Sequence, residues 1–548
     1  MRINVLDSGL VLVYGYKGNL PYLIESKKGF HYTSMHWVSS LLVDTPEAQL
    51  DPQSEANWYK LRDRQVAIWE SFYEDTPNAE DIFKKLFAFP LWAIQKRAAK
   101  AMVFSHKFYL ADDVGLGKTL SALAALVYLK EIKKIKRAVV VTTASLKYQW
   151  LMEVTRAIRG KFKSDYSVCV IDGTKKKRAS QYEQDAFLYI GNYETLRVDA
   201  VKGSPFANPP EAVVFDEAWK LKNSRSLTSK VLKREFRDTP YKYALNASPM
   251  GNGYRDLFGV FDIVDPLIFM NWKTFRSRYV CEKTLFLKNR RVRVFDDSRV
   301  RNIDELKGKV KYSLLRRIGS DCVSEVPRVQ VVPYWITLAG KQRATYNRVR
   351  HDKRLNPLAR SVKARTCCLY TGDVAPGSSP KFQGLVEILK EVVPDSKVLV
   401  FCESRKFLEA VLPSLKSRKI SAALIVGGLT SKKKEERSRA FTEGNVRCLL
   451  MTSAGESGLN LQASDTVVNL DLPWNSERLR QRVGRLRPSL GGSKRKIRVI
   501  NLLARGTIEE RVVEVILRKV GNFSTFFNEP QIDLTGVLDD VKFLSEAV

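Results

Sequence analysis

The most specific chemical pattern in the sequence is a glycine-rich loop that follows a short apolar segment. It runs Leu110-Ala-Asp-Asp-Val-Gly-Leu-Gly-Lys-Thr119 and opens a helical stretch over 120–130. The loop glycines let backbone N–H groups approach phosphates, and a helix N-terminus favours negative charge. Lys118 is expected to reach the β- and γ-phosphates, and the Thr119 hydroxyl to ligate Mg²⁺. The predicted nucleotide-binding residues of the loop are Gly115, Leu116, Gly117, Lys118 and Thr119.

A pair of carboxylates follows a second apolar segment, Val213-Val-Phe215. Asp216 can hold Mg²⁺ through water, and Glu217 can polarise the attacking water as general base. Most isolated Asp-Glu pairs are solvated, but this pair follows a predicted buried strand downstream of a phosphate loop. Together the two motifs predict ATP binding and Mg²⁺-dependent hydrolysis. Gln95, upstream of the loop, can read adenine through its amide, and an exposed helical glutamine is the alternative.

An arginine-rich helix is predicted near the end of the chain, at Gln481-Arg-Val-Gly-Arg-Leu-Arg487. Arginines there can stabilise charge on a γ-phosphate across a cleft, as an arginine finger does. The alternative for such a run is an exposed basic helix face. Gln481, Arg485 and Arg487 are therefore candidate catalytic residues.

The composition points to a polyanionic partner. The 548 residues carry a formal net charge of +33, while residues 1–85 and 521–548 are both slightly acidic, so the charge belongs to the central body. Nucleic acid or an acidic membrane surface would fit. No apolar run approaches the ~18 residues that span a bilayer, and the first residues lack a signal-peptide core. The seven scattered cysteines indicate reduced thiols, and a structural zinc site is not expected.

Short apolar segments alternate with amphipathic stretches in two series, one starting near residue 86 and the other at Val398. This pattern is typical of parallel strands buried between helices. We predict an α/β fold with two doubly wound lobes and a small strand-rich N-terminal domain. The expected ranges are an accessory domain over 1–85, the first lobe over 86–310, a linker or insertion over 311–380, the second lobe over 381–520 and a tail over 521–548.

Residues 281–320 contain twelve Lys and Arg against five acids. Alternating arginines near Phe286 and Phe295 predict a hairpin placed against nucleic-acid phosphates, and the alternative is a surface insertion with stray charge. Trp272 or Phe286 is a candidate strand-separating wedge, with a packed core aromatic as the alternative. The predicted DNA-binding residues are Arg290, Arg291, Arg293, Arg299 and Arg301.

Taken together, the motifs resemble those of the SNF2-type ATPases of helicase superfamily 2 over roughly residues 86–520. The residues that carry the resemblance are Gln95, Gly115–Thr119, Ser145-Leu146, Gln149-Trp150, Asn192–Glu194, Asp216–Asn223, Leu245–Pro249, Asn252, Leu315–Arg317, Asp321, Pro327, Lys397–Phe401, Gly458–Leu461, Trp474-Asn475, Gln481, Arg485 and Thr507–Glu510.

The resemblance implies two RecA-like lobes that bind ATP and Mg²⁺ between them and move along duplex DNA. It adds Gly458 to the predicted nucleotide-binding residues. The segments Asn302–Leu306 and Leu314–Arg317 are similar to a compact subgroup that rewinds DNA and remodels forks.

The chain departs from the family pattern at several positions outside Lys118, Asp216 and Glu217. Trp219 stands where the family usually has histidine, and Thr143 replaces a proline. Asn246-Ala-Ser248 stands in place of Thr-Gly-Thr. Pro488 aligns with the family's second arginine, for which Arg487 is a candidate substitute.

The leading hypothesis is a DNA-dependent ATPase that translocates on duplex or branched DNA and remodels forks or junctions. A strand-displacing helicase is the nearest alternative, and a non-hydrolysing nucleic-acid scaffold is the alternative from another class. A chromatin remodeller is less favoured, because the 28 residues after 520 leave little room for histone-reading modules. The short chain suggests a phage or bacterial source and a cytoplasmic location, or a nuclear one in a eukaryote; protein partners are not predicted.

Overall fold

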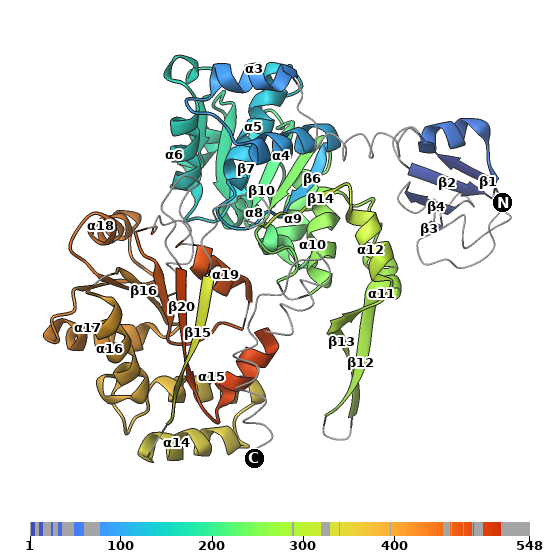
Figure 1. The fold of residues 1–548 in the computed structure, drawn as a ribbon. Coiled ribbons are helices and arrows are strands. Elements are labelled where there is room, and N and C mark those ends of the chain that lie inside the picture. Colours follow the sequence, from blue (N-terminus) through green and yellow to red (C-terminus); the bar gives the residue numbers. More distant parts are fainter. Residues whose placement is uncertain are drawn as a thin grey trace. The chain divides into compact units, whose positions relative to one another are not determined.

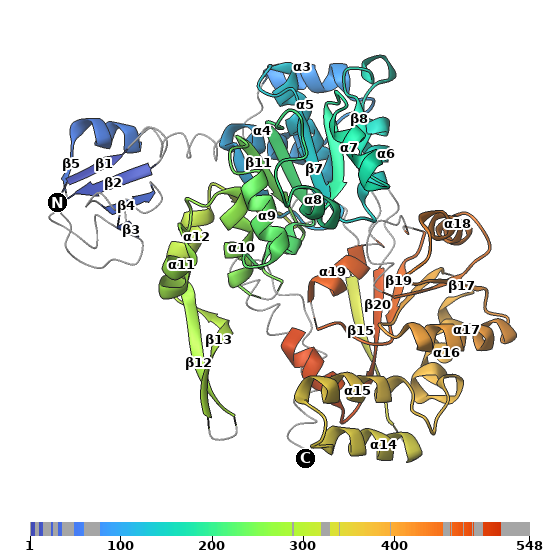
Figure 2. The same cartoon turned by 180° about the vertical axis from the view of Figure 1, so that it is seen from behind.

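The structure is a computed structural model that divides into two compact units, Met1–Ile318 and Gly319–Val548. The ribbon in Figure 1 and its reverse view in Figure 2 show the elements of each unit. The described residues are 2–5, 10–14, 24–25, 31–34, 49–59, 77–251, 253–287, 290–318, 329–338, 340–394, 396–452, 461, 463–474, 476–484, 486 and 497–516.

The N-terminal part of the first unit is strand-rich, as predicted. Its five described strands pair in the order β3-β4-β2-β1-β5, and only the β1–β5 pair is parallel. Residues 52–59 are helical, and most of the helix expected from Trp58 to Tyr73 lies outside the described residues. The strands are β1 (Arg2–Val5), β2 (Leu10–Tyr14), β3 (Ile24–Glu25), β4 (His31–Ser34) and β5 (Gln49–Leu50).

The first unit is built on a parallel sheet of seven described strands. Their apolar segments are buried on both sides, because helices cover both faces of the sheet (Figures 1 and 2). In order across the sheet the strands are β14 (Leu314–Leu315), β6 (Lys107–Leu110), β11 (Tyr241–Leu245), β10 (Ala212–Asp216), β7 (Ala138–Thr142), β9 (Leu188–Asn192) and β8 (Val168–Val170).

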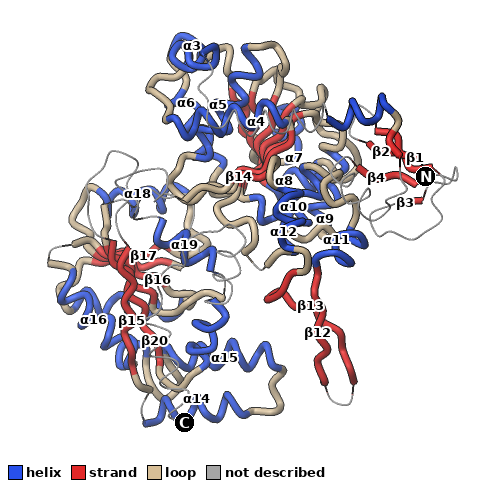
Figure 3. Tube along the Cα trace, turned by 45° about the vertical axis from the view of Figure 1, so that its right-hand side comes forward, coloured by secondary structure: helices blue, strands red, loops and turns tan. Residues whose placement is uncertain are grey.

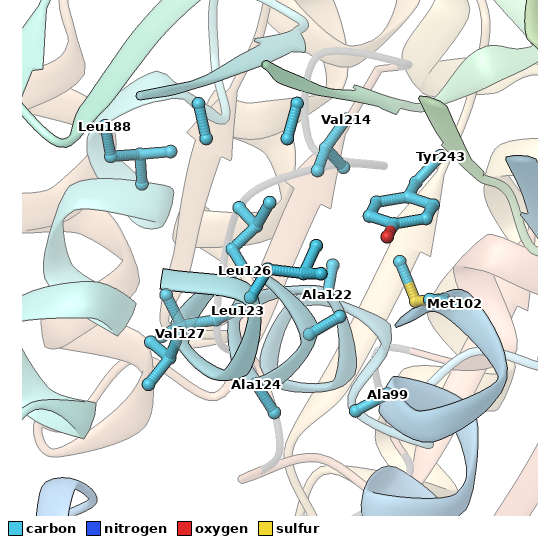
Figure 4. Close-up of a cluster of buried hydrophobic side chains, with 14 of the residues drawn as sticks. Ala99, Met102, Ala122, Leu123, Ala124, Leu126, Val127, Leu188, Val214 and Tyr243 are labelled. Atoms are coloured by element: carbon cyan, nitrogen blue, oxygen red, sulfur yellow. The ribbon is translucent and has the colours of Figure 1, made fainter. Parts of the chain in front are cut away.

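The helix that follows the glycine-rich loop is the centre of this core. Every residue of helix α5 (Lys118–Glu131) from Ser121 to Val127 is buried. Figure 4 shows Leu126 and Ala122 of α5 beneath Val214 and Tyr243 of the sheet. The other described helices before β11 are α3 (Pro77–Leu86), α4 (Ala93–Ser105), α6 (Lys147–Ala157), α7 (Lys175–Tyr182), α8 (Tyr193–Asp199) and α9 (Leu227–Glu235).

Three helices and a hairpin follow β11. They are α10 (Arg255–Val264), α11 (Trp272–Tyr279), the strands β12 (Val280–Leu287) and β13 (Arg290–Val300), and α12 (Ile303–Val310). The predicted hairpin is confirmed, since β12 and β13 pair antiparallel. Figure 3 shows the two strands as an arm that extends away from α11 and α12.

The second unit also contains a parallel sheet, here of six described strands covered by helices on both faces. In sheet order they are β15 (Val329–Ile336), β20 (Ile497–Ala504), β19 (Thr466–Asn469), β16 (Val398–Phe401), β18 (Cys448–Met451) and β17 (Ala422–Ile425). The helices are α14 (Gly340–His351), α15 (Pro357–Leu369), α16 (Pro380–Val392), α17 (Arg405–Ser417), α18 (Ser431–Thr442) and α19 (Ser476–Gly484). The predicted α/β fold with two parallel sheets is confirmed.

Elements near two of the expected domain boundaries pack against or extend the two parallel sheets. Phe83 and Leu86 of α3 belong to the core of the first sheet. Within 311–380, β14 extends the first sheet and β15 the second. Among the described residues, no helix is both long and apolar enough to cross a bilayer. The six described cysteines are free thiols.

Candidate functional site

The order of the parallel strands brings two predicted motifs to one edge of the first sheet. The glycine-rich loop follows β6, the two carboxylates follow β10, and β11 lies between these strands. Since parallel strands share their carboxyl ends, both motifs lie at the edge where open α/β sheets bind ligands. The charges of Lys118, Asp216 and Glu217 are close enough to affect one another's proton affinity.

The loop glycines adopt backbone conformations that few other residues tolerate. Gly115 has φ 90° and Gly117 has φ 76°. Gly117 also ends the loop as the N-cap of α5. A Cβ at Gly117 would lie 2.2 Å from Nε2 of Gln95, so a side chain here would displace this amide and strain the left-handed backbone. The first backbone N–H groups of a helix have no acceptor within it, so those at the start of α5 suit the predicted phosphate contact.

Gln95 is buried rather than exposed, with 2 % of its surface accessible, and this excludes the alternative of a solvated helical glutamine. Its Oε1 accepts a hydrogen bond from the backbone N–H of Trp92 at 3.1 Å. Among the described residues, Nε2 has no hydrogen-bond partner. A buried amide N–H without a hydrogen-bond partner lowers stability unless a ligand accepts its hydrogen bond. Gln95 therefore fits the predicted contact with a nucleotide base.

Lys118 bonds to the loop itself. Its ammonium donates to the backbone oxygens of Asp112 at 2.8 Å and Asp113 at 3.0 Å. Within the described part of the chain, no carboxylate lies within ion-pair distance of this ammonium. Burial lowers the pKa of Lys118, while the charges of Asp112, Asp113 and Glu217 oppose the shift. A cation held by carbonyl oxygens alone is suited to an anionic ligand.

Asp216 is held by donors from two neighbouring elements. Its Oδ2 accepts hydrogen bonds from Oγ1 of Thr142 at 2.9 Å and Nε1 of Trp150 at 2.8 Å, and its Oδ1 accepts one from the N–H of Glu217 at 3.0 Å. The hydroxyl of Tyr193 donates to its backbone oxygen at 2.8 Å. Burial raises the pKa of Asp216, although these donors and Lys118 lower it.

The backbone turns sharply directly after Asp216. Glu217 has φ 53° and ψ 50°, a left-handed conformation that is uncommon outside glycine. Its Oε2 accepts a hydrogen bond from Nε1 of Trp219 at 2.9 Å. The carboxylates of Asp216 and Glu217 are therefore held by separate donors, in keeping with their different predicted roles.

Two arginines at the end of the first unit fix the glycine-rich loop. Arg317 binds the carboxylate of Asp112 through two nitrogens, Nε and Nη2, and donates from Nη1 to the backbone oxygen of Ile94 at 2.8 Å. Arg316 donates to the backbone oxygens of Ala111 at 2.7 Å and Ala247 at 2.8 Å. Strand β14 positions both side chains, because it pairs with β6 immediately before the loop.

The end of β11 contributes an asparagine between the two motifs. Asn246 donates from Nδ2 to the backbone oxygen of Ser248 at 2.8 Å, and its Oδ1 accepts from the N–H of Ser248. Both residues are buried. The side chain of Asn246 therefore shapes the turn after β11.

In the second unit, Gln481 lies half-buried on α19. The neighbouring Arg482 is fully buried and donates to Oδ1 of Asn469 at 2.9 Å, to the backbone oxygen of Asp471 and to Oε1 of Glu403 at 2.8 Å. Arg482 therefore anchors α19 to the sheet. Gly458, Arg485 and Arg487 lie outside the described residues.

The predicted DNA-binding arginines lie on or beside the β12–β13 arm. Arg291, Arg293, Arg299 and Arg301 are exposed. Arg290 pairs with Leu287 at the tip, and its side chain is outside the described set. Trp272 packs against Phe258, Phe275 and Phe295 at the base of the arm, as the core alternative expects. The side chain of Phe286 is not among those described.

The residues of the first unit fit a magnesium nucleotide. The unpartnered Nε2 of Gln95 suits a nucleotide base, and the half-buried Lys118 and the left-handed glycines suit its phosphates. Asp216 and Thr119 offer the oxygens that Mg²⁺ prefers. Thr119 is half-buried in the first turn of α5, and Leu116 of the loop is buried. Within the described residues, no cluster of three metal-binding side chains suggests a separate metal site.

Several residues that complete the site had no assigned role in the sequence analysis. Arg316 and Arg317 belong to a matched segment, but the sequence does not show that they meet the loop. Thr142 and Trp150 reach Asp216 from a separate strand and helix. The signal for Arg317 was the acidic Asp112 within the glycine-rich loop, because a buried carboxylate needs a cation.

Comparison with known proteins agrees with the site. Residues 57–372 match the SNF2-related domain, and residues 380–487 match the helicase conserved C-terminal domain. The uncharacterized ATP-dependent helicase YqhH of Bacillus subtilis is 24% identical over 471 residues, covering 79% of this chain and 77% of that protein. The uncharacterized ATP-dependent helicase MG018 of Mycoplasma genitalium is 26% identical, covering 74% of this chain and 39% of that protein.

A chromatin-remodelling relative and one solved structure extend the comparison. The ISWI chromatin-remodeling complex ATPase ISW1 of Saccharomyces cerevisiae is 25% identical, covering 75% of this chain and 38% of that protein. The chain thus spans about two fifths of the length of MG018 and ISW1. The Sulfolobus solfataricus SWI2/SNF2 ATPase core in complex with dsDNA is 20% identical, with a TM-score of 0.39, covering 81% of this chain and 94% of that chain.

Proposed function

We propose that this chain, which belongs to the SNF2-related family of helicase superfamily 2, is an ATP-driven motor that moves along duplex or branched DNA. The observation that carries the proposal is the assembled nucleotide site of the first RecA-like lobe. There the phosphate loop, Gln95, Asp216 and Glu217 are all held by internal contacts. A non-hydrolysing scaffold would have no need for a base held beside a phosphate loop.

In the proposed hydrolysis, the loop amides and Lys118 bind the phosphates of ATP. Thr119 and Asp216 would hold Mg²⁺, which supplies positive charge to the phosphate oxygens. Glu217 orients the attacking water and accepts its proton. Gln95 contacts the base. Gly458, Gln481, Arg485 and Arg487 are the proposed contribution of the second lobe, with Arg485 stabilising the charge of the transferred phosphoryl group.

The proposed DNA contact is the β12–β13 arm. Arg291 and Arg293 lie on the same face of β13, because they are two residues apart in a paired strand. Both are exposed, and phosphate contacts of this kind bind any sequence. A motor that steps along DNA needs this indifference to sequence.

The arm can be shortened without disturbing its base. Glu282 and Phe295 are partners across the two strands, and Phe295 packs against Trp272 and Arg255. Replacing residues 283–294 by Asn-Gly joins these partners through a two-residue turn. We expect weaker duplex binding and a smaller dependence of binding on salt, with unchanged ATP binding. If the salt dependence of duplex binding is unchanged, the arm does not contact DNA.

The function is tested by ATPase rate and product formation on single strands, duplexes, forks and four-way junctions. The proposal expects duplex-stimulated hydrolysis, with branch migration or rewinding of forks. Unwinding of simple tailed duplexes would instead establish the strand-displacing helicase. Nucleotide binding without hydrolysis on any of these substrates would establish the scaffold.

A further inference from the structure

A hydrogen bond inside the site joins the proposed general base to an aromatic residue two positions later. Nε1 of Trp219 donates to Oε2 of Glu217 at 2.9 Å, and both residues are half-buried. Because Glu217 has a left-handed backbone, its side chain leaves the strand direction and turns toward the 3₁₀ turn Ala218–Leu221. Such conformations persist where the surrounding structure holds them.

The indole ring is itself held by cations. Nζ of Lys220 lies 5.2 Å from the centroid of the Trp219 ring, and Nζ of Lys222 lies 5.9 Å from it. Cations at these distances are attracted to the ring face. Lys220 also pairs with Glu194 of α8 at 3.0 Å. The orientation of the indole therefore depends on α8 as well as on its own turn.

An indole N–H can only donate a hydrogen bond, and it does not titrate in the physiological range. A donor that binds one carboxylate oxygen restrains the rotation of the whole carboxylate group. A general base works only when its reacting oxygen points at the proton it accepts. A fixed donor at Oε2 therefore defines the direction in which Oε1 can act.

We propose that Trp219 is a positioning residue for the hydrolysis, whose indole N–H orients the carboxylate of Glu217 toward the attacking water. The inference rests on the proposed function, in which Glu217 is the base. It assigns a role to the one residue of this acidic motif that departs from the family pattern.

The kinetic test replaces Trp219 by phenylalanine, which keeps an aromatic ring and removes the donor. We expect Trp219→Phe to lower kcat for DNA-stimulated hydrolysis about tenfold, the effect of losing one hydrogen bond. The KM for ATP should change less than about twofold, because the indole donates to the general base Glu217 and not to the phosphate loop. Trp58→Phe, in the N-terminal module, is the matched control and should retain full activity.

A double-mutant cycle separates positioning from a general structural role. In a Glu217→Gln background, Trp219→Phe should change the residual rate little, because the group it orients is already gone. An undiminished tenfold loss in that background would overturn the proposal. A normal kcat for Trp219→Phe in an active chain would also overturn it, whereas a wild-type chain without hydrolysis would overturn the proposed function as well.

The hydrogen bond can be observed without turnover. In nucleotide-free protein labelled with ¹⁵N-tryptophan, the Trp219 indole signal is identified by its loss in Trp219→Phe. We expect this signal to move upfield in Glu217→Gln, because a neutral amide oxygen is a weaker acceptor than a carboxylate. A signal that stays in place would show that the indole does not bind Glu217, and would overturn the proposal.

Discussion

Each unit holds a lysine ammonium against backbone oxygens near the end of a parallel sheet, and the two lysines have opposite surroundings. In the second unit, the ammonium of Lys381 binds Oε1 of Glu509 at 2.7 Å and the backbone oxygens of Leu470 and Leu502. In the first unit, the ammonium of Lys118 binds two backbone oxygens of its own loop. Among the described residues, no carboxylate pairs with it.

The difference separates a structural cation from a functional one. A buried charge with a carboxylate partner is neutralised inside its own unit, and removing either partner leaves the other uncompensated. A half-buried, desolvated charge without such a partner lowers stability and is retained where a ligand uses it. We therefore infer that Lys118 serves ATP and that Lys381 serves the fold.

The largest expected effect is on hydrolysis. Lys118→Ala should lower the rate of DNA-stimulated ATP hydrolysis by about a hundredfold to a thousandfold, as the loss of a preorganised charge does. Its thermal midpoint should equal or exceed that of the wild type, because a desolvated ammonium without a carboxylate in direct contact is gone. ATPase assays and thermal unfolding measure both. Retained ATPase activity, or a large loss of stability, would contradict the inference that Lys118 serves ATP and not the fold.

Lys381→Met should have the reverse effect. It leaves the carboxylate of Glu509 buried without its cation, and we expect a loss of about 3–5 kcal/mol in the free energy of unfolding of the second unit. Urea unfolding measures this loss. The double variant Lys381→Met with Glu509→Leu should recover much of the stability, because it removes both charges. If the single variant is as stable as the wild type, the ion pair does not hold this unit together.

Arg317→Ala tests the fixing of the phosphate loop. The change leaves the buried carboxylate of Asp112 without its two-nitrogen contact, so the loop should relax and the KM for ATP should rise about tenfold. Arg317→Lys should recover only part of the affinity, because lysine cannot make the paired contact. Arg234→Ala, which removes an arginine bonded to the backbone of Val201, is the control. An unchanged KM for ATP would show that the contact between Arg317 and Asp112 does not affect nucleotide binding.

A further expected effect is a pH dependence of the stability of the first unit. Burial in α12 lowers the pKa of Lys309 from 10.5 to about 7. Between these values the folded state binds fewer protons than the unfolded state, so stability should rise with pH from about 7 toward 10. The limiting slope from one group is about 1.4 kcal/mol per pH unit. Lys309→Met should lose this contribution in urea unfolding across pH, and an identical slope in both proteins would contradict the assignment.

The sequence predicted most of the buried strands and the phosphate loop because their signals are local. Buried parallel strands are short apolar runs, and the glycines of the loop are required by their backbone conformations. Strand β11 was not predicted, because Tyr-Lys-Tyr-Ala-Leu places a lysine inside a buried strand. Lys242 satisfies that position by bonding the backbone oxygen of Arg237 at 2.7 Å.

The contacts that complete the site could not be predicted, because they join distant segments. Arg317 and Asp112 are 205 residues apart, and Trp150 and Asp216 are 66 apart. Only the strand order brings them together. The sequence also could not show that Trp219, a departure from the family pattern, makes a hydrogen bond to Glu217. Arg482 belongs to the arginine-rich run Gln481–Arg487, for which an exposed basic helix face was the alternative. Arg482 is buried, so it does not lie on an exposed face.

The most direct test of the account is ATP hydrolysis by the full chain, with and without duplex DNA, compared with Glu217→Gln. We expect hydrolysis that requires Mg²⁺ and is stimulated by duplex DNA. Glu217→Gln should still bind ATP, while its turnover falls about a hundredfold or more. Equal turnover by both proteins, or no stimulation by DNA, would contradict the central claim that the first unit is the hydrolytic site of a DNA motor.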